Sequence, residues 1–165
     1  MTNPSCIARL ENKAALVVGA GASGDGLSNG AACAVKFAAH GAQVICADTS
    51  LDAAEAAAEQ IRRAGGRATA LRVDVADPED IAHLVRQSLD ALGRIDILHN
   101  NVGIQDVCDF QDISVSSWDF VNAVNLRGAM LTIHAVMPSM TERRSGSIRA
   151  NRPNAPRKPP ATTAP

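Results

Sequence analysis

The chain has 165 residues, which is enough for one compact domain with a single core. Hydrophobic residues make up 46% and aromatic residues 2%, with no tyrosine, so Ala, Val, Leu and Ile have to form that core. The formal net charge is -1, so nucleic acid is not expected as a partner. No apolar run reaches membrane-spanning length, so we expect no membrane partner and a cytoplasmic location.

The metal-ligating residue types are scattered along the chain. We interpret the cysteines as reduced and mostly buried, and the histidines as packing or surface residues, because their spacing fits no zinc site and no disulfide framework. No metal is expected. These residues are Cys6, Cys33, Cys46, Cys108, His40, His83, His99 and His134.

The first half of the chain predicts strands and helices in alternation. An apolar run at 14–18 is typical of a buried parallel strand. Helix formers and a terminal glycine predict a helix over 30–40, followed by a strand over 42–47. A capping residue, Thr49 or Ser50, then opens a helix that ends near residue 64, before a third strand over 68–73.

The second half continues the alternation. An Asp-Pro start and a terminal glycine predict a helix over 77–92, followed by a strand over 95–99. An irregular connection over 100–116 precedes a helix over 118–140, and 145–148 are interpreted as the first residues of a fifth strand. This order predicts a three-layer, doubly wound α/β fold of Rossmann type with a parallel sheet. We expect the strand order 3-2-1-4 plus the beginning of a fifth.

The composition changes abruptly after residue 148. The segment 149–165 holds five of the eight prolines and no aliphatic side chain larger than Ala, so it cannot bury enough surface to offset its ordering entropy. We therefore predict one domain over 1–148 and a disordered tail over 149–165. The basic residues around the tail also fit a small patch for a polyanion, although a solvated extension is preferred. They are Arg143, Arg144, Arg149, Arg152, Arg157 and Lys158.

A glycine-rich stretch over 19–30 lies between the first strand and the first helix. Such a loop lets the backbone approach a pyrophosphate, and the free N–H groups of the helix attract its charge. Two alignments are open. A G-x-G-x-x-G pattern occurs at Gly19, Gly21 and Gly24, whereas helix propensity favours a start near Gly30, capped by Ser28 or Asn29.

Asp48 follows the second strand, where a carboxylate can accept hydrogen bonds from the adenosine ribose. The same carboxylate would repel a 2′-phosphate, so the sequence favours NAD over NADP. A helix-capping or solvated acid is the alternative interpretation of Asp48.

Four motifs resemble those of the short-chain dehydrogenases/reductases, in the family's order over residues 9–148. They are the glycine-rich loop, Asp74-Val75 after the third strand, Asn100-Asn101-Val102-Gly103 after the fourth, and the segment 124–128 around Asn125 in the fourth helix. The loop departs from the family pattern, because Val18 replaces its threonine and Ser28 its middle glycine, with a short insertion.

The resemblance implies an oxidoreductase that transfers a hydride between NAD and a secondary alcohol or ketone. Homo-oligomers are implied for the intact family form, and this expectation is not extended to this chain. The expected cofactor contacts are Gly19, Gly24, Gly26, Ser28 and Gly30 for the phosphates, Asp48 for the adenosine ribose, Asp74 and Val75 for the adenine, and Asn100, Val102 and Gly103 for the inner ribose region.

The resemblance also implies catalytic groups that cannot be placed. The family uses a serine after the fifth strand and a Tyr-x-x-x-Lys pair, but this chain has no Tyr, no Ser after Ser147, and Lys158 within the tail. Asn125 alone matches the catalytic set, and a structural bridge is an equal interpretation of it. We therefore expect a truncated member with an unrelated tail and no useful turnover. The alternative function is a non-catalytic NAD-binding module or a defective fragment.

Overall fold

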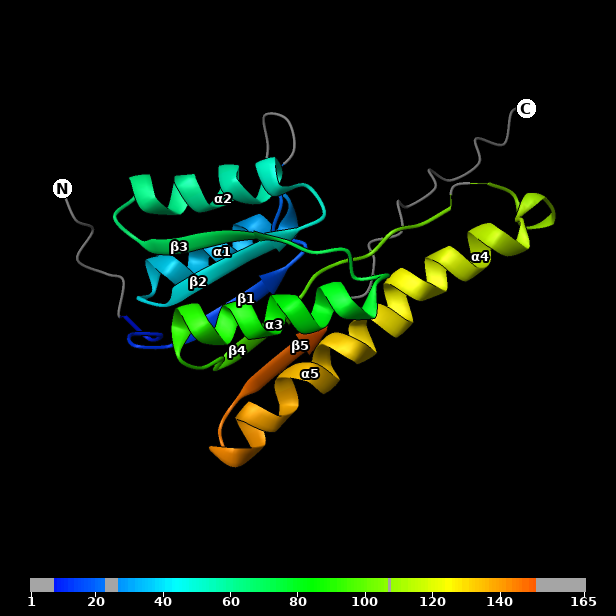
Figure 1. Ribbon diagram of the computed structural model, residues 1–165. Helices are drawn as coiled ribbons and strands as arrows, with labels where there is room; N and C mark the ends of the chain where they lie inside the picture. Colours follow the sequence, from blue (N-terminus) through cyan, green and yellow to red (C-terminus); the bar gives the residue numbers. More distant parts are fainter. Residues whose placement is uncertain (1–7, 23–26, 107, 151–165) are drawn as a thin grey trace, which may run out of the picture.

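The computed structural model describes residues 8–22, 27–106 and 108–150. Its strands form one parallel sheet in the order β3-β2-β1-β4-β5, with helices on both faces (Figure 1). This arrangement confirms the predicted three-layer Rossmann-type fold. The strands are β1 (Ala14–Val18), β2 (Gln43–Asp48), β3 (Arg67–Arg72), β4 (Ile97–Asn100) and β5 (Ser147–Ala150).

The two faces of the sheet carry different helices. Because neighbouring residues of a strand point to opposite faces, Leu16 and Val18 join one core cluster while Ala15 and Val17 join the other. The first cluster includes residues of α3 (Pro78–Leu92) and α5 (Ala129–Glu142). The second includes residues of α1 (Asn29–Ala39) and α2 (Leu51–Arg63).

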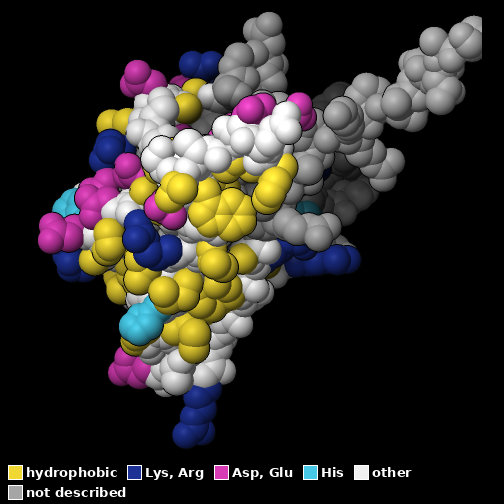
Figure 2. Space-filling model, turned by 90° about the vertical axis from the view of Figure 1, so that its right-hand side faces the viewer, with side chains coloured by type: hydrophobic (Ala, Val, Ile, Leu, Met, Phe, Trp, Pro, Cys, Tyr) yellow, Lys and Arg dark blue, Asp and Glu magenta, His cyan; other side chains and the backbone are white. Residues whose placement is uncertain are grey.

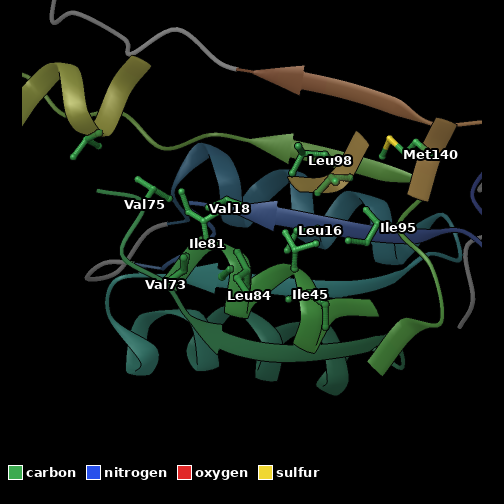
Figure 3. Packing of buried hydrophobic residues seen from close by; sticks show 14 residues of the cluster. Leu16, Val18, Ile45, Val73, Val75, Ile81, Leu84, Ile95, Leu98 and Met140 are labelled. Carbon is green, nitrogen blue, oxygen red and sulfur yellow. The ribbon is translucent and has the colours of Figure 1, made fainter. Parts of the chain in front are cut away.

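The two clusters differ in side-chain size. Between the sheet and α3, large aliphatic residues such as Leu16, Ile45 and Leu84 pack together (Figure 3). On the opposite face alanines predominate on the helices, so α1 and α2 can lie close to the strands. The core without tyrosine, as the composition predicted, is therefore built with mostly alanine on the helices of one face and larger aliphatic residues on the helices of the other.

Local sequence signals set most helix ends. The side chains of Ser28, Ser50 and Asp77 accept hydrogen bonds from the first turns of α1, α2 and α3. Gly93 ends α3 in the left-handed conformation with φ 72°. Ser28 is thus the cap of α1, one of the two residues predicted for that role.

The prediction of one continuous helix over 118–140 is wrong. The chain forms α4 (Val115–Asn122), a π-helix η2 (Ala123–Gly128) and then α5, which contains Pro138. The wider turn of η2 coincides with two hydrogen bonds between the Asn125 side chain and the backbone of Ile104. That tertiary contact is not encoded in helical periodicity.

Strand boundaries differ from the prediction by one or two residues, most clearly in β4 and β5. β4 begins at Ile97 rather than residue 95, and β5 extends through Arg149 and Ala150, which we had assigned to the tail. These two residues pair with His99 and Asn100 of β4, a contact between distant segments that composition does not reveal. Residues 151–165, and with them the predicted disorder of the tail, lie outside the described residues. None of the described helices is long and apolar enough to cross a membrane.

A buried carboxylate before β4 joins the start of β1 to the end of α5. Asp96 is 6% exposed, and its Oδ2 accepts hydrogen bonds from the backbone N of Ala14 at 3.0 Å and from Arg94 Nε at 2.9 Å. Its Oδ1 accepts one from Arg143 Nη1 at 2.9 Å, at the end of α5. Burial raises the pKa of Asp96, but the hydrogen bonds from Arg94, Ala14 and Arg143 outweigh it and lower the pKa to about 2.

We expect Asp96→Asn to destabilise the fold by about 3 kcal/mol at pH 7, because it removes the charge that two arginines and a backbone N–H share. A depressed carboxyl pKa stabilises the fold above the ordinary pKa near 3.8, and this contribution is lost as the pH falls toward 2. Urea unfolding between pH 7 and pH 3 measures both effects. Asp90→Asn, at an exposed position on α3, is the control, and equal losses in the two variants would contradict the role of Asp96.

Candidate functional site

A cleft of about 410 Å³ lies at the carboxyl ends of the central strands. Ligands of open α/β sheets bind in this position, where the loops that follow the strands meet. Seven of the predicted cofactor residues line the cleft: Gly19, Ser28, Asp48, Asp74, Val75, Val102 and Gly103. Gly24 and Gly26 lie outside the described residues.

The first wall of the cleft depends on glycines that allow close backbone contact. Gly19 has φ +78°, and a Cβ on Gly30 would lie 1.9 Å from the carbonyl oxygen of Gly19. The first turn of α1 therefore lies directly against the loop after β1. Ser28 accepts a hydrogen bond from the backbone N of Ala31 at 3.1 Å, which leaves other N–H groups of this helix end free for an anion.

Asp48 ties the glycine loop to the end of β2. Its Oδ2 accepts a hydrogen bond from the backbone N of Gly21 at 2.8 Å. Its Oδ1 accepts from the backbone N of Ser50 at 3.2 Å and from Thr49 Oγ1 at 3.3 Å. A carboxylate has about four acceptor positions, so at least one remains available to a hydroxyl group in the cleft.

The loop after β3 is held from two sides. Asp74 Oδ1 accepts a hydrogen bond from the backbone N of Ala76 at 2.9 Å, while the backbone N of Asp74 donates to Asp80 Oδ2 at 3.1 Å. The hydrogen bond from Asp74 is the main cause that lowers the pKa of Asp80. Val75 is 3% exposed, and its carbonyl oxygen lies 2.6 Å from where a Cβ on Gly128 would be. This fixes the cleft-lining pair Asp74 and Val75 between α3 and η2.

The two asparagines after β4 have different surroundings. Asn100, which we had selected, is buried and does not line the cleft, and its Nδ2 has no hydrogen-bond partner among the described residues. Asn101 lines the cleft, and its Nδ2 donates to the carbonyl oxygen of Gly19 at 3.3 Å. The motif was identified correctly, but which of two adjacent amides faces a strand-end cleft depends on where the strand ends.

Asn125 acts on the loop after β4. Its Oδ1 accepts a hydrogen bond from the backbone N of Ile104 at 2.8 Å, and its Nδ2 donates to the carbonyl oxygen of Ile104 at 2.7 Å. Asn125 does not line the cleft, whereas Ile104 does. The asparagine therefore positions a cleft wall from inside η2.

Several lining residues were missed by sequence reasoning. Gly21 was visible in the G-x-G-x-x-G pattern but was not selected. Asn101 and Val124 lie in segments that resemble the family's motifs, but neither was selected. The others come from distant elements, and no local motif marks them. The missed lining residues are Gly21, Thr49, Val73, Asn101, Ile104, Phe120 and Val124.

A larger hollow of about 770 Å³ lies on the outside of α4, η2 and α5, away from the predicted residues. Figure 2 shows hydrophobic side chains gathered on this side of the molecule, and Phe120, Leu126 and Met130 are exposed large apolar residues that line the hollow. None of the predicted cofactor residues lines it. The glycine loop, Asp48 and Asp74 thus line the smaller cleft and not this hollow.

The parallel sheet and the glycine-lined cleft define an α/β protein of Rossmann type. The family model for short chain dehydrogenase matches residues 13–150. The chain therefore belongs to the short-chain dehydrogenase/reductase family.

The relatives are similar over most of this chain. An uncharacterized oxidoreductase of Bacillus subtilis, YxbG, is 39% identical over 141 residues, which is 85% of this chain and 50% of the relative. A crystal structure of a candidate short-chain dehydrogenase/reductase from Burkholderia xenovorans has a TM-score of 0.81 and 40% identity, covering 85% of this chain and 56% of that one. The chain spans about half the length of the curated relatives it matches.

Two similar structures contain a nicotinamide cofactor. A 7α-hydroxysteroid dehydrogenase in complex with NADH and 7-oxo glycochenodeoxycholic acid has a TM-score of 0.79 and 31% identity, covering 90% of this chain and 55% of that one. A metagenomic short-chain oxidoreductase in complex with NADP has a TM-score of 0.78 and 31% identity, covering 84% and 61%. Family membership thus indicates a nicotinamide cofactor without distinguishing NAD from NADP.

We expect Gly30→Ala to destabilise the protein by about 2 kcal/mol or more, because the new methyl group would overlap the Gly19 carbonyl. Gly65→Ala is the matched control: no atom lies within 4 Å of its added Cβ, so only its φ of +84° adds a cost of about 1 kcal/mol. Thermal or urea unfolding measures both. A smaller loss at Gly30 than at Gly65 would show that α1 does not need this close contact.

Proposed function

We propose that this chain binds NAD in the cleft at the carboxyl ends of the strands. The observation that carries the proposal is the Asp48 carboxylate, held by the Gly21 backbone N–H beside the glycine loop and the first turn of α1. The pyrophosphate would lie over the backbone of Gly19 and the start of α1, near Ser28 and Gly30. Gly24 and Gly26 keep their phosphate role on sequence grounds alone.

The remaining contacts follow the loops around the cleft. The adenosine ribose would donate a hydrogen bond to Asp48, and the adenine would lie against Asp74 and Val75. The inner ribose region would contact Val102 and Gly103. Asn100 keeps its proposed role here on sequence grounds alone, because Asn101 is the amide that lines the cleft.

The charge of the cleft supports NAD over NADP. Asp48 and Asp74 are acids that line it, and no lysine or arginine of the described residues does so. A 2′-phosphate next to Asp48 would therefore meet a carboxylate without a compensating cation. The diphosphate bridge of NAD needs only backbone N–H groups, which the first turn of α1 can provide.

Hydride transfer between NAD and a secondary alcohol or ketone is the reaction that the family resemblance implies for the intact form. The 165 residues include no tyrosine, so none of them can supply the phenol that would exchange the proton. We therefore propose NAD binding without useful turnover for this chain, with Asn125 as a positioning residue. A non-catalytic NAD-binding module is the function that the missing phenol favours.

We expect NAD to bind saturably and to raise the thermal midpoint. Asp48→Ala should weaken NAD about tenfold, as the loss of one charge-assisted hydrogen bond predicts, and should reduce the preference for NAD over NADP. Calorimetric titration with both nucleotides measures this, and Asp52→Asn, an exposed acid on α2, is the control. No saturable NAD signal, or unchanged affinity in Asp48→Ala, would overturn the proposal.

We also expect no increase in NADH absorbance above the enzyme-free rate when the protein is mixed with NAD and small secondary alcohols. The physical reason is the missing proton-transferring group, whose loss alone lowers rates by about 10²- to 10⁴-fold. Turnover by purified protein that disappears in Asn125→Ala would contradict the non-catalytic assignment.

A further inference from the structure

A second hollow of about 410 Å³ lies over β4 and β5 and shares no lining residue with the nucleotide cleft. Leu98 belongs to the core cluster with α3 and α5, so its neighbours Ile97 and His99 point to the α1 side of the sheet. Their partners in β5 are Ser147 and Arg149, which line the same hollow. The hollow therefore belongs to the α1 face of these two strands.

His99, which lines this hollow, has a buried imidazole without hydrogen-bond partners among the described residues. The residue is 2% exposed, and neither Nδ1 nor Nε2 has a hydrogen-bond partner among the described residues. The ring packs edge to face against Phe37, with centroids 6.0 Å apart and an interplanar angle of 84°. A buried polar nitrogen without a hydrogen-bond partner is destabilising, so the imidazole favours an occupant with hydrogen-bonding groups.

The protonation state of His99 defines what it can bind. Burial lowers the pKa of His99, and the nearby Arg149 cation adds to the shift. The ring is therefore neutral near pH 7, with one nitrogen that donates and one that accepts a hydrogen bond. A hydroxyl group can satisfy either nitrogen.

The charged residues that line the hollow have a net positive charge. Lys13 and Arg149 are exposed cations that line it, and neither makes an ion pair with a described acid. The acid among the lining residues, Asp96, is already hydrogen-bonded to Arg94 and Arg143. The hollow thus combines positive charge at its rim with an apolar wall formed by Leu10, Phe37 and Ile97.

We propose that this hollow binds a small aromatic hydroxy acid, distinct from the nucleotide. The aromatic body lies against Phe37 and Ile97, the carboxylate pairs with Lys13 and Arg149, and the hydroxyl group hydrogen-bonds the His99 imidazole. Binding here does not depend on the nucleotide cleft, because the two sites are lined by different residues.

The test uses 4-hydroxybenzoate, benzoate and p-cresol as probes at pH 7.5, with calorimetry and nitrogen NMR of the histidine rings. We expect saturable binding of 4-hydroxybenzoate, with benzoate and p-cresol each at least fivefold weaker. The His99 ring signals should shift on binding. Failure of all three probes to bind, or an unchanged His99 signal at saturation, would overturn the proposal.

Variants distinguish the parts of this site. Arg149→Gln and Lys13→Gln should each weaken 4-hydroxybenzoate at least threefold, whereas Arg86→Gln, an exposed cation on α3, should not. His99→Val places an apolar β-branched residue in the strand and should remove the preference for 4-hydroxybenzoate over benzoate while NAD still binds. Should His99→Val not fold, the arginine and lysine variants still decide. Equal binding by these two variants and the wild type, or loss of 4-hydroxybenzoate binding in Asp48→Ala, would refute a separate site.

Discussion

The structure depends on a direct contact between two backbones. The first turn of α1 lies against the loop after β1 because Gly30 has no side chain to separate them. This contact brings a helix N-terminus to the carboxyl edge of the sheet, where Asp48 and the loops after β3 and β4 also end. Without it the free N–H groups of α1 would lie away from the cleft, and the cleft would have no helix N-terminus to attract an anion. The other parts of the candidate site are arranged around this one close approach.

Much of the fold follows from local chemistry. Ser28, Ser50 and Asp77 are capping residues at the starts of their helices, and Gly93 is a terminal glycine, so the helix ends were predictable within a residue or two. The predicted element bounds are wrong where contacts between distant segments determine the local structure. The π-helix η2 accompanies the contact of Asn125 with Ile104, and β5 reaches Ala150 because it pairs with β4. Composition alone placed Arg149 outside the sheet.

In the candidate site, too, local motifs were predictable and contributions from distant segments were not. Glycines and acids at strand ends carry recognisable chemistry, and the fold brings most of the predicted ones to a single cleft. Part of the apolar wall was not predictable, because Phe120 reaches the cleft from α4, where no local motif marks it. The choice between Asn100 and Asn101 depended on the last residue of β4. A shift of one position in a strand end decides which side chain meets a ligand.

The Asp96 cluster has a consequence for the order in which the chain can assemble. Asp96 contacts Ala14, 82 positions earlier, and Arg143, 47 positions later. During synthesis on the ribosome, β1 can form its contact with Asp96 only after Asp96 has been added to the chain. The carboxylate of Asp96 can bind Arg143 only after a further 47 residues. Contacts over such separations make folding slow relative to that of helical bundles. The nascent protein thus completes the joint between β1, β4 and α5 only after Arg143 has been synthesised.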